Sequence, residues 1–261
     1  NNTINNSNLT LSQNELIQKF IFLLFMIFDK VNNKDKEAMT DIKKNLKTIK
    51  NRIEKIAVKF NRDPSEIKLI VVTKKFDFEK IKPLIDAGHL FFGENKVQEA
   101  EKKWSKTLSS NKSIELHMVG PIQSNKIKTA INLFTAIHSI EKTKTLKIIN
   151  ENITTDSTIK ELFLQVNISK ESSKSGIYIE DMDKFFTEAK DYSKINVNGL
   201  MTLPPPDEEP SLYFALLNKL SKKNMLKYLS MGMSNDFETA IALGATHIRV
   251  GEAIMGPRNK N

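Results

Sequence analysis

Lys74 follows an apolar run, residues 69–73 (LIVVT), that does not alternate between apolar and polar positions. Such a run predicts a strand covered on both faces, as in a parallel sheet flanked by helices. A lysine at the end of a buried strand is partly desolvated, so its amine loses its proton more easily and can attack an aldehyde to form a Schiff base. The alternative is a lysine whose ammonium reaches solvent, and the neighbouring Lys75 fits that description better. Lys74 is therefore the first candidate for covalent chemistry.

Two glycine-containing segments near the end of the sequence have the composition of an anion site. Residues 230–234 (SMGMS) lead into a predicted helix, and residues 249–252 (RVGE) end a short apolar strand. Small and hydroxyl residues before a helix expose backbone N–H groups, and the helix dipole adds to the attraction for an anion. Ser234 alone would be an ordinary helix cap. Two such loops together favour a phosphate site.

Alternating helices and strands must position these residues. The apolar segments predict strands over residues 69–73, 90–92, 115–119, 134–137, 162–166, 197–201, 228–230 and 247–250. Helical patterns precede the first strand and separate the others, near 79–87 and 95–106, from 124, from 141, and over 181–190, 211–221 and 235–243. Eight strands joined by helical crossovers predict a single α/β domain, a (β/α)8 barrel. The active face of such a barrel is at the carboxyl ends of its strands, where Lys74 and both glycine loops would meet.

The composition restricts the classes of function. The chain has 261 residues, a formal net charge of +9 and no cysteine, which excludes disulfides and thiolate metal sites and is compatible with the cytoplasm. The only arginines are Arg52, Arg62, Arg249 and Arg258. Because nucleic-acid readers rely on arginine, and because the lysines are dispersed among acidic residues, we expect a solvated basic surface and no nucleic-acid partner.

Residues 1–38 differ from the rest of the sequence. An asparagine-rich stretch precedes the apolar run Phe20 to Phe28, which is shorter than the roughly 20 residues of a spanning helix. We expect these residues to be an extension upstream of a natural start at Met39, with the barrel over 39–261 and no membrane span. A membrane-tethering helix is the alternative.

Six segments carry a resemblance to a known family. They are VVTKKF, AGHLFFGENKVQEA, LHMVGPIQSNK, VNISKESSKSGI, NGLMTLPPP and LSMGMSNDFETAIALGATHIRVGEAIMGPR. In this order they resemble segments of the pyridoxal phosphate homeostasis protein family, single-domain relatives of the alanine racemase barrel. The resemblance runs from about Met39 to Arg258. It implies a barrel of the fold type III kind without a second β domain, and pyridoxal 5'-phosphate (PLP) as cofactor.

The resemblance also assigns roles by motif. Lys74 resembles the lysine that forms the Schiff base, Arg249 the arginine that faces the pyridine nitrogen, and Gly251 a second phosphate contact. The phosphate loop would comprise Ser230, Gly232, Met233 and Ser234, and the pocket lining would include Asn95, His117 and Met201. Two departures from the family pattern are Lys75-Phe76 after the Schiff-base lysine and Glu252 where a small hydroxyl residue is common.

The resemblance implies a cofactor carrier or buffer in PLP homeostasis, affecting amino-acid and keto-acid metabolism, and not an enzyme. Racemisation requires an acid and a base on opposite faces of the substrate, and in alanine racemases a second domain supplies one of them. We expect a cytoplasmic monomer whose partners are PLP and PLP-dependent apoenzymes. Two alternatives are a minimal PLP-dependent racemase and a PLP-free barrel that binds a phosphorylated metabolite.

Overall fold

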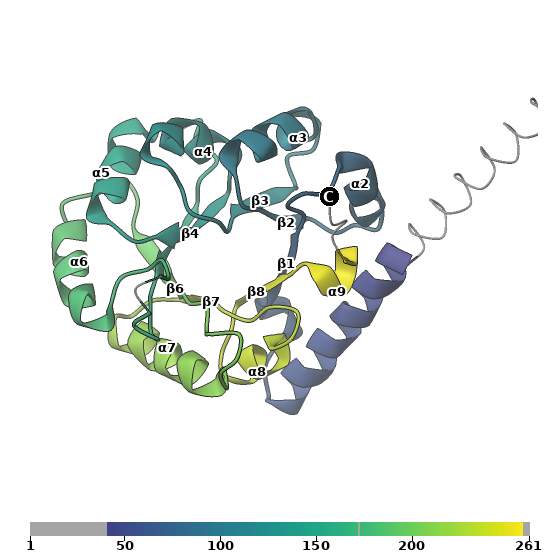
Figure 1. Ribbon diagram of the computed structural model, residues 1–261. Coiled ribbons are helices and arrows are strands. Elements are labelled where there is room, and N and C mark those ends of the chain that lie inside the picture. Colours follow the sequence, from purple (N-terminus) through teal and green to yellow (C-terminus); the bar gives the residue numbers. More distant parts are fainter. Residues whose placement is uncertain (1–40, 172, 258–261) are drawn as a thin grey trace, which may run out of the picture. The chain divides into compact units, whose positions relative to one another are not determined.

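The computed structural model describes residues 41–257 apart from residue 172. Within this range, eight parallel strands form a closed barrel in which each strand pairs with the next along the chain and the last pairs with the first. The helices surround the strands (Figure 1). The predicted (β/α)8 barrel is therefore confirmed.

The strands are short and are separated by helices. They are β1 (Lys68–Val72), β2 (Phe91–Glu94), β3 (Glu115–Met118), β4 (Ala136–Ile140), β5 (Glu161–Gln165), β6 (Val197–Met201), β7 (Tyr228–Ser230) and β8 (His247–Val250). The helices are α2 (Phe78–Asp86), α3 (Val97–Ser110), α4 (Ile127–Leu133), α5 (Thr143–Asn152), α6 (Met182–Ala189), α7 (Ser211–Lys223), α8 (Phe237–Ala242) and α9 (Glu252–Met255). Three 3-10 turns, η1 (Pro64–Glu66), η2 (Ser124–Lys126) and η3 (Ile179–Asp181), precede β1, α4 and α6.

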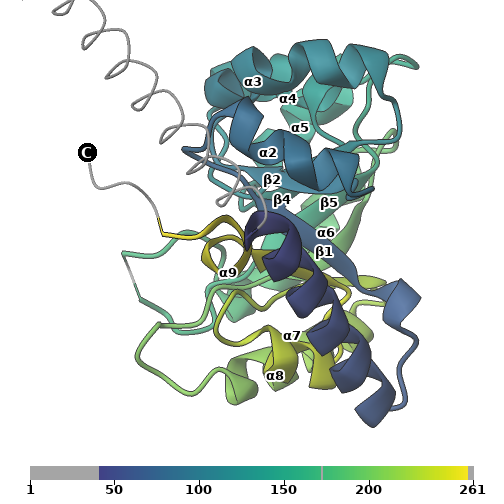
Figure 2. The ribbon, with the colours of Figure 1, turned by 90° about the vertical axis from the view of Figure 1, so that its right-hand side faces the viewer.

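A helix over residues 42–59 precedes η1 and lies alongside α8 and α9 (Figure 1 and Figure 2). Its apolar residues recur at spacings of three and four, and they are buried at Ile42, Leu46, Ile49 and Ile53. Polar contacts fix it in place: Asn45 Nδ2 donates to the Ile254 carbonyl at 3.2 Å, and Arg52 pairs with Glu238 at 3.0 Å. The helix thus covers the part of the barrel where β8 returns to β1.

Most of the hydrophobic core lies between the strands and the surrounding helices. The fully buried Trp104 of α3 packs on Phe92 of β2, with ring centroids 4.8 Å apart. The opposite face of each strand points into the barrel, because side chains alternate along a strand. That interior is crowded: a Cβ atom added to Gly199 would lie 2.5 Å from the Phe163 ring.

The bounds of one predicted strand were wrong, and one helix was not predicted. The strand predicted over 134–137 is β4, Ala136–Ile140, because His138 and Ser139 find buried partners in Ser230 and the Gly120 carbonyl and continue the strand. The short α9 after β8 was not predicted. The expected extension over residues 1–38, including its membrane-tether alternative, lies outside the described residues. None of the helices described in residues 41–257 combines the length and the apolar content needed to cross a membrane.

We expect Gly199→Ala to destabilise the protein by about 2 kcal/mol, because the added methyl group overlaps Phe163 inside a packed barrel. Chemical denaturation measures the loss. Gly251→Ala, just after β8, is the control, since a Cβ atom there would meet its nearest neighbour at an ordinary contact distance of 3.5 Å. Equal stability losses in the two variants would contradict a tightly packed interior at Gly199.

Candidate cofactor site

A pocket of about 570 Å³ lies at the carboxyl ends of the strands. It collects residues that follow β1, β2, β7 and β8, in agreement with the predicted active face. Six residues predicted from the sequence line it: Lys74, Asn95, Met233, Ser234, Arg249 and Gly251. The structure therefore brings together the candidate nucleophile and both glycine loops.

The remaining four predicted residues, His117, Met201, Ser230 and Gly232, lie outside the set that lines this pocket. His117, Met201 and Ser230 are buried in the barrel interior. Met201 packs with Ala136 and Phe163. Gly232 has a φ of 94°, and a Cβ atom there would lie 2.6 Å from the Ala240 side chain. Gly232 thus lets the loop turn into α8, and direct cofactor contacts by these four residues stay predictions.

The loops after β7 and β8 present polar groups to the pocket. The Met233 N–H donates to the Asp236 carboxylate at 2.5 Å, and the Ala253 N–H donates to Ser234 Oγ at 3.4 Å, which joins the two loops. The backbone N–H groups of Ser234 and Asn235 donate to no other residue in the described part of the chain. These two donors are available to an anion. The Glu252 carboxylate also lines the pocket.

Arg249 brings a buried cation to the pocket floor. Its side chain donates to Ser230 Oγ and, at 3.1 Å, to the Thr202 carbonyl. Burial lowers the pKa of Arg249 to about 10, while the carboxylate of Asp236 opposes that shift. The guanidinium therefore keeps its charge at neutral pH.

Residues of α3 hold the backbone on both sides of Lys74. Lys103 Nζ donates to the Thr73 carbonyl at 3.0 Å, and it also bonds the carboxylates of Glu94 and Glu99, each at 3.0 Å. The Lys75 N–H donates to Glu99 at 2.7 Å, and Lys75 adopts a positive φ of 65°. The position of Lys74 therefore depends on a carboxylate–lysine–carboxylate group between β2 and α3.

Glu94 is the buried centre of this group. Its Oε1 accepts from the Thr73 hydroxyl at 2.7 Å and from Trp104 Nε1 at 3.1 Å, as well as from Lys103. The other oxygen, Oε2, has no hydrogen-bond partner among the described residues. A buried carboxylate is tolerated here because several donors converge on one oxygen. Glu94 was not predicted from the sequence, although a carboxylate at the end of a buried strand is unusual and could have indicated it.

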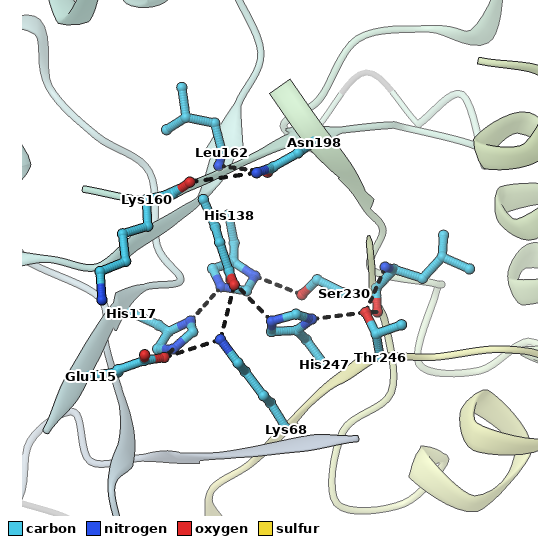
Figure 3. A network of polar contacts seen from close by, with 12 residues as sticks. Lys68, Glu115, His117, His138, Lys160, Leu162, Asn198, Ser230, Thr246 and His247 are labelled. Atoms are coloured by element: carbon cyan, nitrogen blue, oxygen red, sulfur yellow. Dashed lines mark hydrogen bonds and ion pairs between the residues drawn. The ribbon is translucent and has the colours of Figure 1, made fainter. Parts of the chain in front are cut away.

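A polar network fills the barrel beneath the pocket (Figure 3). At its base, Lys68 pairs with Glu115 at 3.0 Å and Glu161 at 2.9 Å, and Glu161 also bonds His247 at 3.1 Å. Burial favours a higher pKa for Glu161, but hydrogen bonds from His247 and Lys68 outweigh it and lower that pKa to about 2. Glu161 is therefore ionised at neutral pH.

Two histidines connect this base with the pocket floor. His117 Nδ1 lies 2.9 Å from His138 Nε2, and His138 Nδ1 lies 2.7 Å from Ser230 Oγ. Burial lowers the pKa of both histidines well below the ordinary value, which keeps them neutral. Of this network, only His117 and Ser230 were predicted from the sequence. Their partners come from distant strands, so no local pattern identifies them. Within the described residues, no group of three or more potential ligands is placed to hold a metal ion.

Comparisons with known proteins agree with this geometry. Residues 41–259 match the family model for the alanine racemase N-terminal domain, which defines the class of barrel. The chain is 33% identical over 230 residues to the pyridoxal phosphate homeostasis protein of Escherichia coli K12, covering 85% of this chain and 98% of the relative. The corresponding protein of Haemophilus influenzae is 32% identical, with coverage of 84% and 97%. The chain therefore belongs to the pyridoxal phosphate homeostasis protein family.

Solved structures extend the likeness to three dimensions. PipY of Synechococcus elongatus with PLP bound has a TM-score of 0.66 and 29% identity, and the match covers 78% of this chain and all (100%) of PipY. An unknown protein from Bifidobacterium adolescentis has a TM-score of 0.75 and 27% identity, with coverage of 84% and 96%. Alanine racemase of Clostridium difficile 630 shares the fold alone, with a TM-score of 0.59, 14% identity and coverage of 82% and 56%.

We expect Lys103→Met to destabilise the protein by about 3 kcal/mol, because the buried Glu94 carboxylate would lose the cation that it pairs with. Lys102→Met, one position away on the exposed face of α3, is expected to change stability by less than about 0.5 kcal/mol. Urea denaturation of the two variants compares them directly. Equal stabilities would mean that the Glu94–Lys103 pair contributes nothing to the fold.

Because four histidines are buried, we expect the free energy of unfolding to fall in acid. Burial lowers the folded-state pKa of His117, His138 and His247, and that of His89 to about 4. The ordinary pKa of histidine is about 6.5. Below that pH, the histidines bind protons in the unfolded chain but stay unprotonated in the folded chain. Stability is therefore complete above about pH 6.5 and is lost as the pH falls, by about 1.4 kcal/mol per pH unit for each such histidine.

His138→Phe should remove one of these contributions and reduce the slope between about pH 6 and 5 accordingly. The measurement is the free energy of unfolding as a function of pH for both proteins. The low pKa of Glu161 acts in a separate window, because its contribution is complete above about pH 4.5 and is lost as the pH falls toward 2. A wild-type stability that is flat from pH 7 to 5 would refute neutral buried histidines.

Proposed function

We propose that this chain binds PLP in the pocket at the carboxyl ends of the strands and acts in PLP homeostasis, as a carrier or buffer of the cofactor. The observation that carries the proposal is the meeting of Lys74 with the loops after β7 and β8 and with the buried Arg249 in one pocket. Family membership supports it, since the curated relatives are named for PLP homeostasis and PipY has been solved with PLP bound.

Each part of the pocket suits one part of this cofactor. Lys74, which lines the pocket, is the proposed Schiff-base partner of the aldehyde, and the Ser234 and Asn235 N–H groups are the proposed donors to the phosphate. Arg249 is the proposed partner of the pyridine nitrogen. Its fixed positive charge disfavours a proton on that nitrogen by like-charge repulsion, which makes the ring a weaker electron sink. PLP supplies an aldehyde for reversible attachment, and the protein supplies orientation and charge.

We further propose that the bound cofactor is stored or delivered without robust catalysis. The names of the curated relatives describe homeostasis and no reaction, which supports this proposal. PLP-dependent apoenzymes are the proposed recipients, a monomer the proposed state and the cytoplasm the proposed location.

Titration with PLP tests the site through the visible absorption of the Schiff base. We expect the wild type to develop this band and Lys74→Ala to lack it, because the mutant has no lysine among the described residues that line the pocket. Lys75→Ala is the matched control and should keep the band, since Lys75 is exposed and outside the set that lines the pocket.

Alanine racemisation measured on the loaded protein separates a carrier from an enzyme. A carrier shows the band without turnover, whereas turnover that depends on Lys74 would support the minimal racemase. A wild type that never develops the band would overturn PLP binding and favour a barrel for another phosphorylated metabolite.

A further inference from the structure

One continuous chain of buried hydrogen bonds leads from the pocket floor into the barrel. It runs from the Arg249 guanidinium to Ser230 Oγ, from Ser230 to His138 Nδ1 at 2.7 Å, and from His138 Nε2 to His117 Nδ1 at 2.9 Å. All four side chains are buried, and they come from β8, β7, β4 and β3. Figure 3 shows His117, His138 and Ser230 pointing toward one another across the barrel.

The chemistry of the four groups gives this chain a direction. A guanidinium can only donate, so Ser230 Oγ accepts from Arg249 and has its own proton left for His138 Nδ1. A neutral His138 that accepts at Nδ1 has its proton on Nε2, which then donates to His117 Nδ1. His117 is left with its proton on Nε2, 3.9 Å from the Glu115 carboxylate.

The reverse direction leaves a buried group unsatisfied. If His138 donated from Nδ1, Ser230 Oγ would accept from both neighbours, and its hydroxyl proton would have no acceptor among the described residues. A buried hydroxyl without an acceptor costs free energy. The direction away from Arg249 leaves only the His117 Nε2 proton without a hydrogen-bond partner among the described residues, with the Glu115 carboxylate 3.9 Å away. The reverse direction leaves two groups unsatisfied, the Ser230 hydroxyl proton and the His117 Nε2 lone pair.

The orientation of the Arg249 guanidinium depends on this hydrogen-bond chain, because no carboxylate forms an ion pair with Arg249 within the described residues. Its acceptors are the neutral Ser230 hydroxyl and the Thr202 carbonyl. Packing holds the next group in place, because the His138 ring stacks on Phe163 with centroids 4.2 Å apart and an interplanar angle of 9°. The orientation of the guanidinium is thereby tied to the orientation of His138.

We propose that Ser230, His138 and His117 are positioning residues, which form a one-directional hydrogen-bond chain that holds the Arg249 guanidinium toward the bound ligand. The identity of the ligand rests on the proposed function, whereas the direction of the chain does not. The proposal assigns a function to the polar interior of the barrel, and two measurements test its two parts separately.

Nitrogen NMR of the 15N-labelled full chain without PLP tests the direction. The sequence has four histidines, so single His→Gln variants assign every imidazole signal. We expect His117 and His138 to be neutral, with Nδ1 unprotonated and Nε2 protonated. A proton on Nδ1 of His138, or a charged imidazole ring at neutral pH, would refute the proposed direction of the hydrogen bonds whether or not the protein binds PLP.

PLP affinity and the absorption maximum of the bound cofactor test the positioning role. His138→Phe keeps the stacked ring but loses the hydrogen bond, and we expect about fivefold weaker binding and a shifted maximum. His138→Asn keeps an acceptor near Nδ1 and should restore most of the affinity even if it lowers stability equally. His89→Gln, a buried histidine outside the network that bonds the Phe91 carbonyl, should leave both readouts unchanged.

Wild-type affinity and spectrum in a folded His138→Phe variant would refute the positioning role while PLP binding by the wild type stands. Ser230→Ala is the second variant if His138→Phe does not fold, and the same outcome in it would refute the role equally. A wild type that does not bind PLP would refute the proposed function together with this positioning role, and the NMR result would still decide the direction of the chain.

Discussion

The pairing of β8 with β1 is the constraint on which the site depends. In this pairing Ile70 lies opposite Arg249, and Val71 lies opposite Val250. The register brings the end of β1, with Lys74, next to Gly251 and the loops that follow β7 and β8. A slip of one residue would exchange the inward and outward faces of β8 and remove Arg249 from the pocket. Closure of the barrel therefore brings pocket residues from near both ends of the described chain into one site.

The interior of the barrel differs from an ordinary apolar core. Lys68 and Glu161 are paired at its base, and Arg249 is held by neutral dipoles at its top. Burying such groups is expensive, and replacing them with apolar side chains of similar volume is often neutral or stabilising in other proteins. Their presence here is better explained by what they do for Arg249 and the pocket than by a gain in stability. Neutral histidines lie between the Lys68–Glu161 pair and Arg249, where they supply hydrogen-bonding groups without adding charge.

Much of the architecture could be predicted from local patterns, and the partners of individual side chains could not. The alternation of eight apolar strand segments with helical patterns was sufficient for the barrel, and Lys74 with the two glycine loops was sufficient to locate the pocket. The bounds of β4 were missed because His138 and Ser139 look like the end of an apolar segment unless their partners in β7 and the β3 loop are known. The same holds for Glu94, whose partners come from α3 and the end of β1.

The central claim is that Lys74 holds PLP covalently in this pocket. The most direct test is borohydride reduction of the PLP-loaded protein, followed by proteolysis and mass analysis of the peptides. The account predicts a pyridoxyl group on the peptide that contains Lys74, and on that lysine when the fragment is sequenced. A pyridoxyl group on another lysine, with Lys74 unmodified, would contradict the account, since no other lysine lines the pocket within the described residues.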